Sequence, residues 1–267
     1  MPLTTFFKPG IVSESEIFLV LGTGTHPVYF QESPDHYLWG KGTLFLAEWN
    51  GVSFAITARH VIEKQYASSK DLQLFVPEYK TSIAVSGATT PKCRKCTPQH
   101  EFDDIDDIII FVVNGSDVTP AWDSWRMQEL SMPARKLKAG EQLFSIGYPH
   151  SARDIDYENN NQRKATPLIS VGMLSNDSIG EGIFTIDCAA FDIDLDNVKD
   201  EDRDEHIDKY LSGISGGPVF SRIDGTFRYV GMIVRGGVIA QKIHFICSSY
   251  VTSLMDHKSK SILKSNL

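Results

Sequence analysis

The stretch YLSGISGGPVF, Tyr210–Phe220, places a glycine-rich turn directly before an apolar run that begins at Pro218. Small residues around Ser215 let the backbone turn sharply and direct several amides toward one point. A serine hydroxyl is a weak nucleophile unless a neighbouring base takes its proton, and an oxyanion formed by its attack needs N–H donors. The stretch is therefore either an ordinary tight turn with an inert serine or a turn that presents a nucleophile.

Short apolar segments separated by turns surround this stretch and predict an all-β protein. They are rich in β-branched and aromatic residues and are bounded by Gly, Pro, Asn or charges. The segments are residues 17–23, 43–49, 52–58, 72–78, 82–87, 107–113, 141–148, 168–174, 182–191, 218–223, 229–234 and 242–250. About a dozen strands suit one sandwich or two small barrels. Apolar residues at helical spacing occur only at residues 58–69 and 248–266. The polar stretch Asn114–Glu141 is the expected seam, the boundary between the first set of strands and the second.

The composition and charge of the chain argue against several classes of protein. The chain has 267 residues, 42% of them hydrophobic, and a formal net charge of -8, which disfavours a general nucleic-acid binder. No run approaches the roughly 18 apolar residues that span a bilayer, and the first residues do not resemble a secretory signal. Because the 4 cysteines do not form a disulfide framework, a reducing, cytoplasmic location without membrane partners is expected.

Two further segments offer a candidate base and a candidate acid for Ser215. FAITARHVIEK places His60 after an apolar strand and at the start of a helical turn, where a side chain can face a cleft. DDIDDIIIFVV places Asp107 before an apolar strand, where it can accept a hydrogen bond from a histidine ring. Asp106 is the competing acid, which strand alternation would direct to the opposite side. The chain order His60, Asp107, Ser215 is that of the chymotrypsin-type triad.

At these residues the sequence resembles the trypsin-like, chymotrypsin-fold serine proteases, and most closely their bacterial, high-temperature-requirement branch. The matching segments are GKGTLFLAE, AITARHVI, DIIIFVV, FSIGYP, SVGMLS and YVGMIV, within about Gly40–Gly237. The resemblance implies two six-stranded antiparallel β-barrels and a short C-terminal helix. Residues 1–125 would form the barrel with His60 and Asp107, residues 126–250 the barrel with Ser215, and residues 251–267 the helix and tail.

The resemblance also implies roles for individual residues. Ser215 would be the nucleophile, His60 the general base and then acid, and Asp107 the group that fixes the histidine tautomer. The N–H groups of Gly213 and Ser215 would form the oxyanion hole. Substrate would meet two further sets of residues: Val234, Arg235 and Gly236 on an edge strand, and Asp208, Lys209 and Tyr210 near the specificity pocket. Asp208 would favour basic side chains there, whereas Lys209 would favour acidic ones.

The sequence departs from the zymogen-activated relatives at one position. Those relatives carry an aspartate before the nucleophile, which pairs with a newly freed N-terminus, and here that residue is Ile214. Isoleucine cannot make the ion pair, so activity is expected without such processing. The relatives' tethered PDZ domain has no counterpart after the resembling segment, so regulation by a tethered peptide reader is not expected.

The predicted function is that of a serine endopeptidase that acts on protein or peptide substrates through an acyl-enzyme, without a cofactor or a metal. A regulatory partner protein is one expected means of restraining the proteolytic activity. Two alternatives stay open: a catalytically silent binding or scaffold protein of the same fold, and an esterase that uses the same triad.

Two other polar segments carry weaker hypotheses. Cys93, Cys96 and His100 have a spacing that can share a zinc ion, but no fourth ligand follows, and free or redox-paired cysteines are the simpler interpretation. The acidic segment 191–208 is interpreted as a solvated loop, with attraction of a basic substrate segment as the alternative.

Overall fold

The computed structural model describes about half of the chain in detail. The described residues are 22, 24–28, 42–63, 73–76, 81–91, 104–113, 125–126, 137–150, 153–156, 162–165, 167–176, 183–188, 212–223, 226–237 and 242–265. The expected strand at 17–23 and the expected seam at 114–141 therefore lie largely outside the described residues.

Six antiparallel strands close into a barrel in the C-terminal half, here called the C-terminal barrel. Its strands, in barrel order, are β11 (Leu168–Leu174), β12 (Ile183–Cys188), β15 (Lys242–Cys247), β14 (Thr226–Gly237), β13 (Pro218–Ile223) and β8 (Gln142–Gly147). Alternate side chains such as Ile243 and Phe245 of β15 are fully buried in its interior. Closure gives every strand a neighbour on both sides. At one end of β14 this pairing is one-sided, because β13 reaches only as far as Met232 and Arg235, Gly236 and Gly237 pair with β15 alone among the described strands.

The N-terminal strands form an open seven-stranded sheet, here called the N-terminal sheet. Its order is β1 (Thr25–Pro27), β2 (Thr43–Trp49), β3 (Val52–Thr57), β6 (Ile109–Val113), β5 (Thr81–Thr89) and β4 (Gln73–Val76), with β7 (Trp125–Arg126) paired in parallel to β2. A barrel requires its two edge strands to pair, and among the described strands β1 pairs with β2 and β4 with β5. The described strands therefore do not show the expected second closed barrel. The prediction of a mainly β protein with a C-terminal helix is confirmed.

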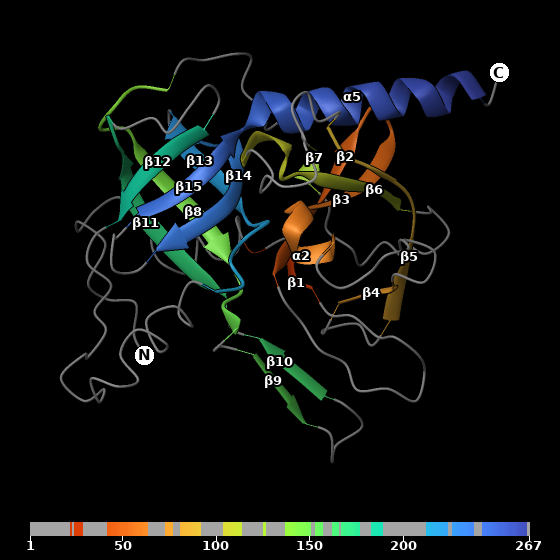
Figure 1. Ribbon diagram of the computed structural model, residues 1–267, viewed down its shortest axis with the longest axis horizontal. Helices are drawn as coiled ribbons and strands as arrows, with labels where there is room; N and C mark the ends of the chain where they lie inside the picture. Colours follow the sequence, from red (N-terminus) through yellow and green to blue (C-terminus); the bar gives the residue numbers. More distant parts are fainter. Residues whose placement is uncertain are drawn as a thin grey trace, which may run out of the picture.

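The long helix α5 (Ser248–Ser265) connects the two halves. It begins directly where β15 ends and lies along β14, β15 and β2, so that it crosses from the C-terminal barrel to the N-terminal sheet (Figure 1). Val251, Met255 and Ser259, at a spacing of four residues, are fully buried on one side of the helix. Asn50 donates from Nδ2 to Ser259 Oγ at 3.2 Å, which ties the β2–β3 turn to the helix.

The remaining described elements are short. The helix α2 (Arg59–Glu63) follows β3, and the 3-10 turn η3 (Asp104–Asp106) precedes β6. The strands β9 (Arg153–Asp156) and β10 (Gln162–Ala165) form a hairpin that projects from the body of the protein (Figure 1). None of the described helices combines the length and apolar content needed to cross a membrane.

Candidate active site

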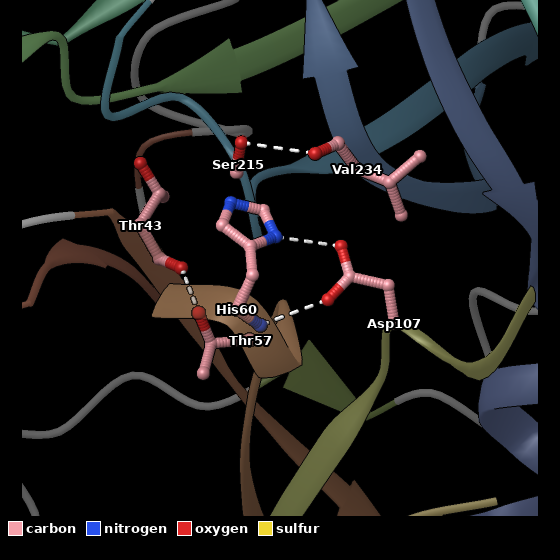
Figure 2. Close-up of polar contacts among 6 residues, drawn as sticks. All are labelled: Thr43, Thr57, His60, Asp107, Ser215 and Val234. Carbon is pink, nitrogen blue, oxygen red and sulfur yellow. Dashed lines mark hydrogen bonds and ion pairs between the residues drawn. The ribbon is translucent and has the colours of Figure 1, made fainter. Parts of the chain in front are cut away.

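His60 lies where β3 leads into α2, and Asp107 holds it in two ways. Asp107 Oδ1 accepts from the His60 backbone N–H at 2.9 Å, and Oδ2 lies 2.6 Å from His60 Nδ1 (Figure 2). The Asp107 carbonyl also accepts from the N–H of Arg59 at 3.3 Å. One residue just before β6 therefore fixes both the first turn of α2 and the orientation of the imidazole.

This contact determines the histidine tautomer. An ionised carboxylate only accepts hydrogen bonds, so Nδ1 must carry the proton and Nε2 of the neutral ring keeps its lone pair. Figure 2 shows the ring between Asp107 and Ser215, with its second nitrogen on the Ser215 side. The His60 side chain is 35% exposed and that of Asp107 only 11%, so the acid is enclosed while the ring is open to solvent.

The competing acid, Asp106, does not take this position. It is the last residue of η3, and the carboxylate that meets the imidazole belongs to Asp107. Asp107 and Ile108 lie between η3 and β6, so the strand's alternation does not extend back to either aspartate.

Ser215 lies in a turn whose glycines have conformations that side chains disfavour. The Ser215 turn, residues 212–217, contains Gly213 at φ 100° and Gly216 at φ 89°. The Ser215 hydroxyl donates to the carbonyl oxygen of Val234 at 3.0 Å (Figure 2). In this state the single hydroxyl proton points to β14, and a rotation about the Cα–Cβ bond would redirect it toward His60.

A bulge in β14 explains why the Val234 carbonyl is available. Ile233 pairs with Phe245 and Arg235 with His244, so Val234 is the residue skipped in the register. A bulged residue leaves the ladder and turns its backbone groups elsewhere. Val234 is buried, whereas Arg235 and Gly236 are exposed and continue the strand beyond the Ser215 turn.

One hydrogen bond within the Ser215 turn and three from other segments fix its backbone. Four consecutive carbonyl groups each accept a hydrogen bond: Ser212 from His150 N at 2.7 Å, Gly213 from Thr43 Oγ1 at 2.8 Å, Ile214 from Gly217 N at 2.9 Å and Ser215 from Thr43 N at 2.8 Å. In a trans peptide the next N–H points away from the carbonyl, and the described chain has no cis bond. The N–H groups of Gly213 and Ser215 are thus directed away from these partners, in fixed orientations.

Ile214 anchors the same turn in the C-terminal barrel. Its side chain is 2% exposed and belongs to the barrel core with Leu143 and Val219. A Cβ added to Gly147 would lie 2.7 Å from Ile214 Cβ, so the backbone of β8 passes directly against the isoleucine. An apolar contact thus holds the residue that directly precedes Ser215.

Two basic side chains lie close to His244, that of Arg235 on β14 and that of Lys242 on β15. Burial, together with the neighbouring charges of Arg235 and Lys242, lowers the pKa of His244. Thr185 Oγ1 and His244 Nδ1 are 3.1 Å apart, which fixes the ring against β12. The exposed part of β14 on which substrate was expected to pair therefore carries one cationic side chain of its own, that of Arg235, while Lys242 Nζ lies 3.9 Å from Asp187 Oδ1.

Several predicted residues cannot be placed. Asp208, Lys209 and Tyr210, the acidic segment 191–208, and Cys93, Cys96 and His100 all lie outside the described residues. In the part of the chain that is described, no group of three or more His, Cys, Asp or Glu side chains could hold a metal ion.

Sequence reasoning missed Thr43 and the bulge at Val234. Thr43 is the first residue of β2, and nothing in the segment GKGTLFLAE marks its hydroxyl as a partner for a residue far along the chain. Comparison with protein-family models and with curated proteins returns no match for this chain. The resemblance to trypsin-like proteases therefore rests on the sequence motifs alone.

Proposed function

We propose that the chain is a serine endopeptidase of the chymotrypsin type, with Ser215 as nucleophile, His60 as general base and Asp107 as the orienting acid. The observation that carries the proposal is the doubly bound His60, whose free nitrogen lies on the side of a glycine-rich turn that presents Ser215. The finer fold proposal, two barrels with the site between them, rests on the closed C-terminal barrel and on the sequence resemblance.

The proposed reaction follows from the tautomer of His60. The Ser215 hydroxyl proton moves to Nε2 of His60 while Oγ bonds to the substrate carbonyl carbon, and the oxyanion is stabilised by the N–H groups of Gly213 and Ser215. The imidazolium, stabilised by Asp107, then gives its proton to the departing amine, which leaves an acyl-enzyme. Water, deprotonated by His60, hydrolyses the acyl ester and restores the free Ser215 hydroxyl.

Substrate binding is proposed along the exposed part of β14. An extended peptide would add as a strand beside Val234, Arg235 and Gly236, with main-chain hydrogen bonds supplying affinity. Because Ser215 donates to the Val234 carbonyl in the present state, the hydroxyl must rotate before it can transfer its proton.

That same hydrogen bond favours the second candidate, a binding protein without turnover, in which Ser215 stabilises the turn. The two functions differ in the reactivity of the hydroxyl. A fluorophosphonate probe labels a serine efficiently only when a base activates the hydroxyl and donors stabilise the negative charge that develops on the phosphoryl oxygen during the attack.

The test is labelling of the purified wild type, of Ser215→Ala and of His60→Gln with a fluorophosphonate probe, followed by a peptide-library digest with the wild type. We expect labelling and cleavage by the wild type and neither by the two variants. A wild type that stays unlabelled while folded would contradict the protease proposal, and would leave the binding function as the better account. Cleavage of simple esters without any peptide cleavage would indicate an esterase.

A further inference from the structure

We propose that Thr43 is a positioning residue, which holds the Ser215 turn in its reactive conformation without a zymogen-type cleavage. The inference rests on the proposed function, because it explains how that site is ordered in a chain with Ile214 in place of the relatives' aspartate. It assigns the task to a residue of β2, in the other half of the molecule.

Every polar group of Thr43 is engaged, and the residue is fully buried. Its N–H donates to the Ser215 carbonyl at 2.8 Å, and its hydroxyl donates to the Gly213 carbonyl at 2.8 Å. The same hydroxyl accepts from the N–H of Tyr148 at 2.8 Å. Its carbonyl accepts from Thr57 Oγ1 at 2.6 Å (Figure 2). Thr43 therefore joins β2, the end of β3, the end of β8 and the Ser215 turn.

The two peptide units held by Thr43 flank the one that matters for catalysis. The Ser215 N–H belongs to the peptide between Ile214 and Ser215, and Thr43 holds the peptide before it and the peptide after it. The Gly217 N–H holds the carbonyl of the unit itself, that of Ile214, while Thr43 holds the units on both sides and so sets the positions of the Ile214 and Ser215 Cα atoms. Loss of a Thr43 contact would let a flanking unit move, and the unit that carries the Ser215 donor would move with it.

The peptide unit that carries the Gly213 N–H lies next to the units that Thr43 holds. Its own carbonyl, that of Ser212, accepts from His150, and the next carbonyl is the one bound by the Thr43 hydroxyl. At φ 100°, Gly213 has the backbone freedom to flip, so the hydroxyl acts where the turn is most able to rearrange.

Close packing supports a fixed rather than a transient contact. A Cβ on Gly216 would lie 2.0 Å from the Thr43 carbonyl oxygen and 2.4 Å from Thr57 Oγ1. The turn thus lies against Thr43 with no room for an intervening water. A substitution to valine can remove the hydroxyl of Thr43 from this junction while the side-chain volume is kept.

The experiment compares Thr43→Val, Thr43→Ser and wild type by kcat and KM on a peptide that the wild type cleaves, with unfolding temperatures measured in parallel. Valine keeps the shape but leaves the Gly213 carbonyl and the Tyr148 N–H without their partner, whereas serine keeps the hydroxyl. We expect kcat of Thr43→Val to fall about 10²–10³-fold, the range for loss of an oxyanion-hole donor. KM should change less than about threefold, because ground-state binding along β14 does not use the donor. Thr43→Ser should stay within about tenfold of the wild-type kcat.

Thr185→Val is the matched control. Thr185 is equally buried, and its hydroxyl bonds to His244 rather than to the Ser215 turn. Its loss should lower the unfolding temperature without a drop in kcat. A folded Thr43→Val with wild-type kcat would overturn the inference while leaving the protease proposal intact, whereas an unlabelled, inactive wild type would overturn both. If Thr43→Val does not fold, Thr43→Ala replaces it, and an alanine variant as active as the serine variant would overturn the role of the hydroxyl.

Discussion

Replacing Ile214 by alanine tests the apolar anchor of the Ser215 turn. The side chain is 2% exposed and packs in the core of the C-terminal barrel against the backbone of Gly147. Truncation of a buried isoleucine to alanine typically costs about 2–5 kcal/mol, through lost burial and the cavity left behind. A loss of about 3 kcal/mol lowers the unfolding temperature by roughly 6–12 °C in a domain of this size.

The anchor also makes a prediction about activity. If Ile214 only contributed to stability, the folded variant would react normally with a fluorophosphonate at a temperature well below its transition. If it positions the neighbouring N–H groups, the labelling rate falls in protein that circular dichroism shows to be folded. We expect a fall of about tenfold or more, because a small displacement of a donor weakens oxyanion stabilisation.

Ile243→Ala is the matched control for this experiment. Ile243 lies on β15 in the same core, is fully buried, and is remote in sequence from the Ser215 turn. It should show a similar loss of stability and an unchanged labelling rate in the folded protein. Equal labelling rates for Ile214→Ala and Ile243→Ala would refute the positioning role. An unfolding temperature for Ile214→Ala within a degree of wild type would refute the burial argument itself.

Three further predictions follow from the site and its surroundings. Asp107→Asn should lower kcat by about 10⁴-fold with little change in KM, because a side-chain N–H beside His60 Nδ1 favours the tautomer that cannot accept a proton; equal kcat values would contradict the assigned tautomer. Gly216→Ala should abolish labelling, because its Cβ would lie 2.0 Å from a backbone oxygen at φ 89°; Gly140→Ala, with φ 76° and nothing within 4 Å of the added atom, is the control that should still react. Burial lowers the pKa of His26 from 6.5 to about 4, so the unfolded chain binds more protons below pH 6.5 and stability falls as the pH drops from there toward 4. The loss of unfolding free energy should reach about 2 kcal/mol at pH 5. The measurement is the urea midpoint of the wild type and of His26→Gln as the pH is lowered. Equal slopes for the two proteins would refute the prediction.

Local sequence pattern was enough to predict most strands of the described chain. The segments 43–49, 168–174 and 218–223 coincide with β2, β11 and β13, because apolar and β-branched residues bounded by turn formers favour an extended chain wherever they are placed. The hairpin of β9 and β10 was not predicted. Its strands read RDID and QRKA and lack that pattern, so pairing between the two segments defines them rather than local preference.

The sequence by itself also determined which residue types are candidates for chemistry: a histidine after a strand, an aspartate before one, and a serine among glycines. Only the tertiary structure decided which of two adjacent aspartates meets the histidine, that β14 bulges at Val234, and that Thr43 holds the Ser215 turn. The physical reason is the range of these contacts. Asp107 is 47 residues from His60, and Gly213 is 170 residues from Thr43. Propensity and spacing act over a few residues, whereas such contacts exist only after the sheet and the barrel have packed together.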